Sequence, residues 1–179
     1  MVVERALRPV RGGGGSFVVA DALNHKEAAS FINVDEKSKR LIELLQIDGR
    51  SSYARLAKEV NLSEAAVRQR VQRLIDQGVM QIVAVTDPLT VGFNRQAMIG
   101  IRASGDLRKV AESIASLREV DYVVVCAGRY DLLAEVVCEN DEQLMNLLND
   151  EIRRVDGVTT IETFVYLRLE KQTYAWGVK

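Results

Sequence analysis

The chain has 179 residues, of which 47% are hydrophobic and 27% charged, an ordinary composition for a globular protein of one medium domain or two small ones. No apolar run reaches the roughly 18 residues that a membrane-spanning helix needs, and no sustained hydrophobic region of a secretory signal follows the N-terminal arginines. The formal net charge of -1 argues against a uniformly basic nucleic-acid-binding chain. Because neither a membrane-spanning run nor a signal region is found, no membrane partner is expected, and the expected compartment is the cytoplasm.

The charge is unevenly distributed along the chain. Residues 34–80 carry nine Lys/Arg and seven Asp/Glu, whereas residues 90–179 carry eleven against fourteen. Within residues 52–75 the balance is five basic to two acidic residues. A basic N-terminal part on an acidic C-terminal part is compatible with DNA binding, although the excess is small.

Residues 1–33 show little periodic pattern and are interpreted as a flexible N-terminal extension or as the result of a misplaced start codon. The run Gly12–Gly15 is not expected to bind phosphate, because no Gly-Lys-Ser/Thr follows it. The one histidine, His25, lies in this extension, so a general base or a metal ligand is not expected there.

Residues 34–80 have the pattern of a helix-turn-helix domain. A first helix is predicted from Asp35, whose carboxylate can cap it, to Asp48, with Gly49 ending it. Ser52 is predicted to cap a short second helix that ends near Val60.

A third helix follows after a tight turn at Asn61-Leu62. Ser63 and Glu64 are predicted to open it, and Gly78 to end it after Gln77. The turn of three to four residues between the second and third helices is the spacing of a helix-turn-helix motif.

The third helix has two contrasting faces. Val67, Val71 and Leu74 fall on one side of a helical wheel and form the predicted core stripe. The opposite side carries long polar side chains that can bond base edges or phosphates, and a small alanine that permits close approach. The predicted DNA-binding residues are Ser63, Ala65, Arg68, Gln69, Arg70, Gln72 and Arg73. Arg70 lies between the faces and can contact either phosphate or a neighbouring helix. The alternative to DNA binding is that all these polar side chains are simply exposed to solvent.

After Gly78 the pattern becomes extended. Residues 79–86 are predicted to form a strand, which Asp87-Pro88 ends, and residues 81–92 are interpreted as a strand linker or hinge between two domains.

Residues 93–171 are predicted to fold in the order β-α-β-β-α-β, the ferredoxin-like plan, which makes the chain an α+β protein; residues 172–179 form a C-terminal tail. The predicted elements are strands at 96–102, 122–127, 132–139 and 159–169 and helices at 106–117 and 141–155. Both helices cover one face of the sheet. The other face is left without a helix. Its apolar positions are predicted to include Val123, Val125, Val136 and Val165, so this face needs a partner subunit to cover it and a homo-oligomer is expected.

The turn Gly128–Asp131 joins two of these strands and is a candidate ligand site. A glycine lets backbone N–H groups approach a ligand carboxylate, and Asp131 can accept hydrogen bonds from an α-ammonium group. The alternative is a structural hairpin turn in which Gly128 supplies an unusual φ and Asp131 satisfies local backbone donors.

Other functional classes find little support. Cys126 and Cys138 are expected to be buried, reduced thiols, and neither a metal-ligand spacing nor a His-Cys-Asp set is present, so we expect no enzyme, metal or cofactor. An enzyme on the ferredoxin-like domain and an amino-acid sensor whose N-terminal part binds protein remain the alternatives. Trp176 is expected to pack in an interface or in the tail.

Three segments together resemble the Lrp/AsnC family of leucine-responsive, feast/famine regulators. They are DEKSKRLIELLQIDG at residues 35–49, SYARLAKEVNLSEAAVRQRVQRLIDQGVM at residues 52–80 and CAGRYDLLAEV at residues 126–136. The resemblance covers about residues 34–171.

The resemblance implies a transcriptional regulator of amino-acid metabolism genes that binds double-stranded DNA and would associate with the nucleoid. It implies a winged or extended helix-turn-helix domain, and homodimers that assemble into tetramers or octamers. It also implies an amino-acid effector, bound between subunits near the turn. The effector residues carried over by motif position are Gly128, Arg129, Tyr130, Asp131, Thr163 and Val165.

Overall fold

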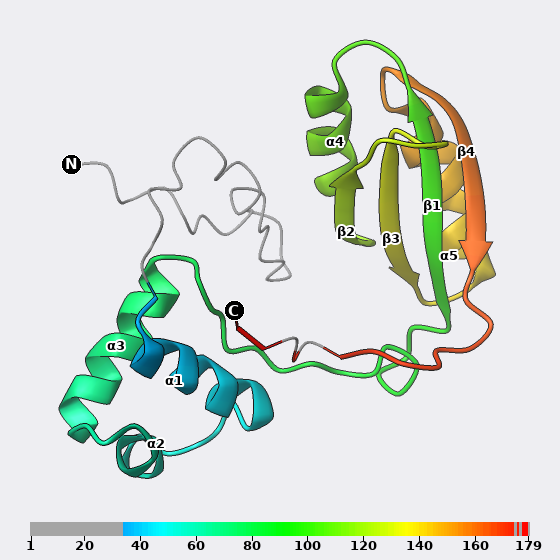
Figure 1. Ribbon diagram of the computed structural model, residues 1–179. Coiled ribbons are helices and arrows are strands. Elements are labelled where there is room, and N and C mark those ends of the chain that lie inside the picture. Colours follow the sequence, from blue (N-terminus) through cyan, green and yellow to red (C-terminus); the bar gives the residue numbers. More distant parts are fainter. Residues whose placement is uncertain (1–33, 174, 176, 179) are drawn as a thin grey trace. The chain divides into compact units, whose positions relative to one another are not determined.

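The computed structural model describes residues 34–173, 175, 177 and 178, which fall into two compact units. The first unit, here called the head, contains residues 34–84 with the described residues after Glu170, and the second, here called the body, contains residues 85–170. Figure 1 labels their helices and strands. The predictions for residues 1–33 and for Trp176 lie outside the described residues.

The head consists of three helices, α1 (Glu36–Ile47), α2 (Tyr53–Val60) and α3 (Glu64–Asp76). Each begins after its predicted capping residue, whose side-chain oxygen accepts a hydrogen bond from the backbone N–H three residues further on. The distances are 2.8 Å at Asp35, 3.3 Å at Ser52 and 3.2 Å at Ser63. The predicted starts of all three helices are therefore confirmed.

The three predicted helix ends are also confirmed to within a residue. Asn61 ends α2 in the left-handed region with φ 50°, and Gly78 follows α3 with φ 68°. α1 ends at Ile47 with Asp48 as its C-terminal cap, so the helix stops before Gly49 as predicted, although Gly49 itself does not adopt a positive φ. The Asp48 backbone is extended, and its carboxylate accepts hydrogen bonds from the Arg50 N–H and the Ser51 hydroxyl.

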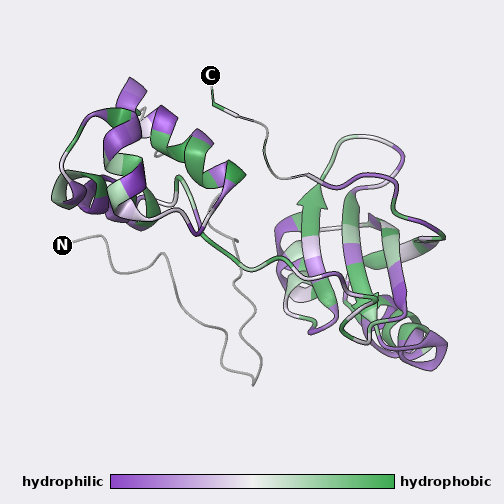
Figure 2. Ribbon diagram, turned by 90° about the horizontal axis from the view of Figure 1, so that it is seen from below, coloured by the Kyte–Doolittle hydropathy of each residue, from purple (hydrophilic) through white to green (hydrophobic). Residues whose placement is uncertain are grey.

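The head core forms where the apolar stripes of the three helices meet, and in Figure 2 each head helix carries both hydrophobic and hydrophilic residues. α3 contributes the predicted stripe of Val67, Val71 and Leu74, all buried. Burial of such a side chain contributes about 1.5–3 kcal/mol, so this stripe fixes which face of α3 remains outside.

The body is a four-stranded antiparallel sheet in the order β2-β3-β1-β4. Its strands are β1 (Arg95–Ala103), β2 (Val120–Val125), β3 (Leu132–Cys138) and β4 (Val158–Val165). Its helices are α4 (Leu107–Ala115) and α5 (Asp141–Asn146), and α5 continues through a π-helical turn, Leu147–Glu151, and a 3-10 turn, Ile152–Arg154. The predicted ferredoxin-like plan is confirmed, but the predicted helix at 141–155 is not one regular α-helix.

Both helices pack on the same face of the sheet. Val110 and Ile114 of α4 and Leu144 of α5 join one core with every second residue of the central strands, such as Ile99 of β1 and Ala134 of β3. The other face carries no helix of the body and is here called the open face.

The valines predicted for the open face lie on the helix-covered side. Val136 is fully buried in the core, and Val123, Val125 and Val165 pair directly with the core residues Ala134, Leu132 and Ala97. Residues that pair directly across two strands point to the same face. By the same register the apolar residues of the open face are Met98, Tyr122, Val124, Leu133, Val137 and Phe164.

The prediction of a strand at residues 79–86, and so of a strand linker, is wrong for the single chain. This segment pairs with no strand among the described residues, and it is followed by turns closed by hydrogen bonds such as that from the Phe93 N–H to the Pro88 carbonyl. A strand needs a neighbour to accept its backbone hydrogen bonds. The segment leaves Ile82, Val83 and Val85 exposed.

No helix in the described part of the chain is both long and apolar enough to cross a membrane.

Candidate functional site

The outer face of α3 is the first candidate site. The five predicted residues on the outer side of the helical wheel are all exposed, while the core stripe is buried. Together with Tyr53 of α2 and Asp76 at the end of α3 they line one groove on the head. The five residues are Ala65, Arg68, Gln69, Gln72 and Arg73.

Contacts within the head orient two of the groove side chains. The guanidinium carbon of Arg68 lies 4.8 Å from the centroid of the Tyr53 ring, and the Gln72 amide donates to the Asp76 carboxylate at 2.8 Å. Gln72 therefore already donates one hydrogen bond at the C-terminal end of α3, whereas Arg68 lies over the Tyr53 ring of α2.

Arg70 and Ser63 have structural roles. The Arg70 guanidinium forms an ion pair with Asp35 at 2.6 Å and donates to the Ser38 hydroxyl at 3.1 Å, so it takes the neighbouring-helix alternative. Hydrogen bonds from Ser38, together with the Arg70 guanidinium, lower the pKa of the Asp35 carboxyl to about 2. Ser63 caps α3.

The turn between β2 and β3 is the second candidate site, and Asp131 anchors it. One Asp131 carboxylate oxygen accepts a hydrogen bond from the Ala103 N–H at 2.9 Å, and the Asp131 N–H donates to the Ile101 carbonyl at 2.9 Å. Gly128 has no positive φ, and a Cβ placed there would meet nothing within 4 Å. Asp131 therefore satisfies a backbone donor, as the structural alternative predicted. The same alternative predicted an unusual φ at Gly128, and that part is wrong.

Tyr130 folds back from this turn over β1. A Cβ on Gly100 would lie 2.8 Å from the Tyr130 ring, so only glycine leaves room for this packing. The Tyr130 hydroxyl is hydrogen-bonded to the Glu162 carboxylate, and its ring meets that of Phe164 edge-on with centroids 6.1 Å apart.

Arg129 completes this cluster from the rim of the turn. Its guanidinium lies 3.3 Å from the Glu162 carboxylate and 5.5 Å from the Tyr130 ring centroid, and its carbonyl accepts from Arg102 at 3.0 Å.

The structure does not bring Thr163 and Val165 to this cluster. They pair with Ile99 and Ala97, so they share the helix-covered side, and it is Glu162 and Phe164 that face Tyr130. Sequence analysis missed Gly100, Glu162 and Phe164 as neighbours of the turn. A glycine within a strand pattern was the available signal, because it marks a close approach.

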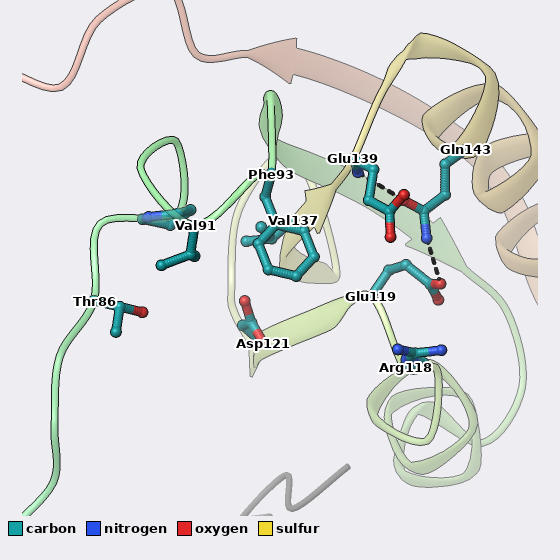
Figure 3. A pocket seen from close by; sticks show the side chains of 10 residues that line it. Thr86, Val91, Phe93, Arg118, Glu119, Asp121, Val137, Glu139 and Gln143 are labelled. Carbon is teal, nitrogen blue, oxygen red and sulfur yellow. Dashed lines mark hydrogen bonds between the residues drawn. The ribbon is translucent and has the colours of Figure 1, made fainter. Parts of the chain in front are cut away.

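The body also contains a pocket of about 290 Å³, shown in Figure 3. Phe93 and Val137 form an apolar wall, and Glu119 and Asp121 add carboxylates. Gln143 accepts from the Glu139 N–H at 2.6 Å and donates to Glu119 at 2.9 Å. Burial and the nearby charge of Glu135 raise the pKa of Asp121.

Both cysteines are free thiols, as predicted. Cys138 is buried, which raises its pKa to about 11, whereas Cys126 is only half-buried and its thiol donates to the Tyr130 carbonyl at 3.2 Å. No group of three or more His, Cys, Asp or Glu side chains within the described residues could hold a metal ion.

Comparison with known proteins relates both units to one family. Residues 34–75 match the model of the AsnC-type helix-turn-helix domain, and residues 93–179 match that of a C-terminal dimeric alpha+beta barrel domain of AsnC-type regulators.

The curated relatives are named as regulators and match over most of their length. An HTH-type transcriptional regulator of Pyrococcus abyssi is 32% identical over 80% of this chain and 92% of its own. The HTH-type transcriptional regulator FL11 of Pyrococcus furiosus is 31% identical over 82% of this chain and 97% of its own.

Among solved structures, the leucine response regulatory protein LrpA of Mycobacterium tuberculosis is 26% identical with a TM-score of 0.71, and covers 77% of this chain and 95% of its own. AsnC of Escherichia coli shares the fold with a TM-score of 0.69, at 24% identity over 78% of this chain and 95% of its own. The chain therefore belongs to the AsnC/Lrp family of helix-turn-helix transcriptional regulators.

Proposed function

We propose that the chain binds specific sites in double-stranded DNA through the outer face of α3 and so regulates genes of amino-acid metabolism in the cytoplasm, on the nucleoid. The groove of Arg68, Gln69, Gln72 and Arg73 on a helix-turn-helix carries this proposal. Guanidinium and amide groups can bond base edges in the major groove, and the buried stripe of α3 holds them outward. In this scheme residues 34–80 bind DNA, residues 81–92 connect, and residues 93–171 sense and oligomerise.

Selection from a random DNA pool with the wild-type chain tests DNA binding. A dimer presents two copies of α3, so the enriched sequences should contain inverted half-sites about one helical turn, roughly 10 bp, or a multiple apart. Enrichment of no sequence above the starting pool would contradict the proposal.

The homodimer is proposed to form through the open face, where Tyr122 and Phe164 are 51% and 44% exposed in the single chain. A two-helix, four-strand unit leaves this face for another molecule to cover. The match to a dimeric C-terminal domain supports this part of the proposal, and assembly of dimers into tetramers or octamers is part of it.

An amino acid is proposed as the effector, bound where subunits meet at the turn 128–131. The open space at Gly128 and the carboxylate of Asp131 support this site. One protein of this fold, from Neisseria meningitidis, was solved as a complex with L-Met; it is 23% identical with a TM-score of 0.70 and covers 79% of this chain and 94% of its own.

Melting curves with each of the twenty amino acids test the effector. A ligand that binds only the folded state raises the melting temperature with the logarithm of its concentration above its Kd. Gly128→Thr should fold normally, because nothing lies within 4 Å of a Cβ there, yet should lose the response. Asp131→Asn keeps an acceptor for the Ala103 N–H and removes the charge that would pair with an ammonium group. Full response in both variants would place the effector elsewhere.

A further inference from the structure

Tyr53 is the first residue of α2, yet it forms a wall of the groove on α3. Its ring is half-buried and packs against the head core, so the wall is fixed by the fold. The Arg68 guanidinium carbon lies 4.8 Å from the ring centroid, within the roughly 6 Å over which a cation and an aromatic face attract.

A contact between a guanidinium and an aromatic ring supplies no oxygen acceptor, so it need not use up the N–H donors of the guanidinium. Among the described residues the Arg68 guanidinium forms no hydrogen bond and no ion pair, so its five donors remain available. Two other polar side chains of α3 already use donors within the head: Arg70 forms an ion pair with Asp35, and Gln72 donates to Asp76.

An arginine that is already oriented loses less rotamer freedom when it binds. Arginine side chains carry considerable rotamer entropy, and their planar fork recognises the O6 and N7 atoms of guanine with two hydrogen bonds only when it is correctly directed. Arg68 also lies in the N-terminal half of α3, the part of a recognition helix that contacts base edges.

We propose that Tyr53 is a positioning residue for base recognition: its ring holds the Arg68 guanidinium with its N–H edge directed out of the groove, and this sets the affinity and the base preference at the position that Arg68 contacts. The inference rests on the proposed DNA binding by α3. Tyr53 acts through Arg68, and its hydroxyl is not required.

The test is a double-mutant cycle on the full chain with the DNA enriched by the wild-type protein. Tyr53→Leu keeps an apolar side chain against the core but removes the aromatic face, and Tyr53→Phe keeps the face but removes the hydroxyl. Each is measured by fluorescence anisotropy with Arg68 present and with Arg68→Ala. Tyr53→Leu should weaken binding about two- to five-fold and flatten the preference at one base pair, whereas Tyr53→Phe should match wild type.

In the Arg68→Ala background, Tyr53→Leu should have no further effect. An equal loss in Tyr53→Phe and Tyr53→Leu, or a loss that persists without Arg68, would show that Tyr53 contacts DNA itself or acts through the fold, and would overturn the inference while leaving DNA binding intact. If no DNA is enriched by wild type, the proposed function fails and the inference fails with it. If Tyr53→Leu lowers the melting temperature, the cycle is repeated with Tyr53→Met.

Discussion

Asp35 shows how one side chain serves two contacts. Its carboxylate caps α1 through the Ser38 N–H and also binds Arg70 of α3, which joins the first helix of the head to the third. The capping role follows from the sequence, because Asp before an apolar periodic segment is an N-cap signal. The contact with Arg70 does not, because it joins residues 35 positions apart.

Asp35→Asn should lower the stability of the head at neutral pH by an amount on the order of 0.5 kcal/mol, since Asn still caps a helix but cannot form a half-exposed ion pair. The folded pKa is about 2, below the ordinary value of 3.8. The ionised carboxylate therefore stabilises the fold above about pH 4, and its contribution disappears as the pH falls through 2. Urea titrations followed by the NMR signals of α1 check this; a difference that does not change with pH would contradict it.

Gly157 is required both by its backbone and by its surroundings. Its φ is +91°, and a Cβ would lie 2.8 Å from the Ser104 carbonyl oxygen and 2.9 Å from Val110. Gly105 has φ +81° but nothing within 4 Å of a Cβ, so it serves as a matched control.

Gly105→Ala should cost about 1–2 kcal/mol through its φ alone. Gly157→Ala should cost about 1–3 kcal/mol more, because the fully packed core must move to admit the methyl group. Denaturant titrations of the body measure both. Equal costs for the two variants would show that the contacts around Gly157 do not constrain it.

Among the elements, the three head helices and the order of the body strands could be predicted from sequence, because capping residues and hydrophobic periodicity act locally. The face on which each valine lies could not. β2 contains Val123, Val124 and Val125 in succession, so the alternation of apolar and polar residues that identifies a buried face is absent there. A register shift between Val120 and Tyr122 removes the remaining phase information.

The segment 79–86 fails as a strand for a different reason. Its β-branched residues have strand propensity, but propensity cannot supply the neighbour that a strand requires. The sequence pattern therefore predicted a strand at residues 79–86, but no neighbouring strand among the described residues pairs with this segment.

Val124→Lys and Val125→Lys test the faces of β2 with adjacent residues. Val124 pairs with Leu133 of the open face and Val125 with Leu132 of the covered face, and Val125 is already 52% exposed. A lysine buried in a dimer interface costs several kcal/mol, so Val124→Lys should give a monomer of 20.0 kDa by light scattering, while Val125→Lys should remain a dimer. Dissociation by Val125→Lys alone would place the interface on the other side.

At the scale of the whole molecule, the proposed function assigns DNA binding to the head, and dimer formation and ligand binding to the body. The family and both domains could be inferred from three sequence segments, but the partners of the turn could not. Gly100, Glu162 and Phe164 reach Tyr130 from β1 and β4, and only the strand register shows that they face it.

The central claim is that the outer face of α3 contacts DNA. The most direct measurement is the anisotropy-derived Kd of the Arg68→Ala/Arg73→Ala double variant for the DNA enriched by the wild-type chain. The matched control, Arg108→Ala/Lys109→Ala, removes two exposed cations from α4 of the body and so changes the net charge equally. Each bidentate contact to guanine contributes about 1–3 kcal/mol, so the α3 variant should bind at least about ten-fold more weakly and the control should match wild type. Equal affinities of the two double variants would contradict the claim.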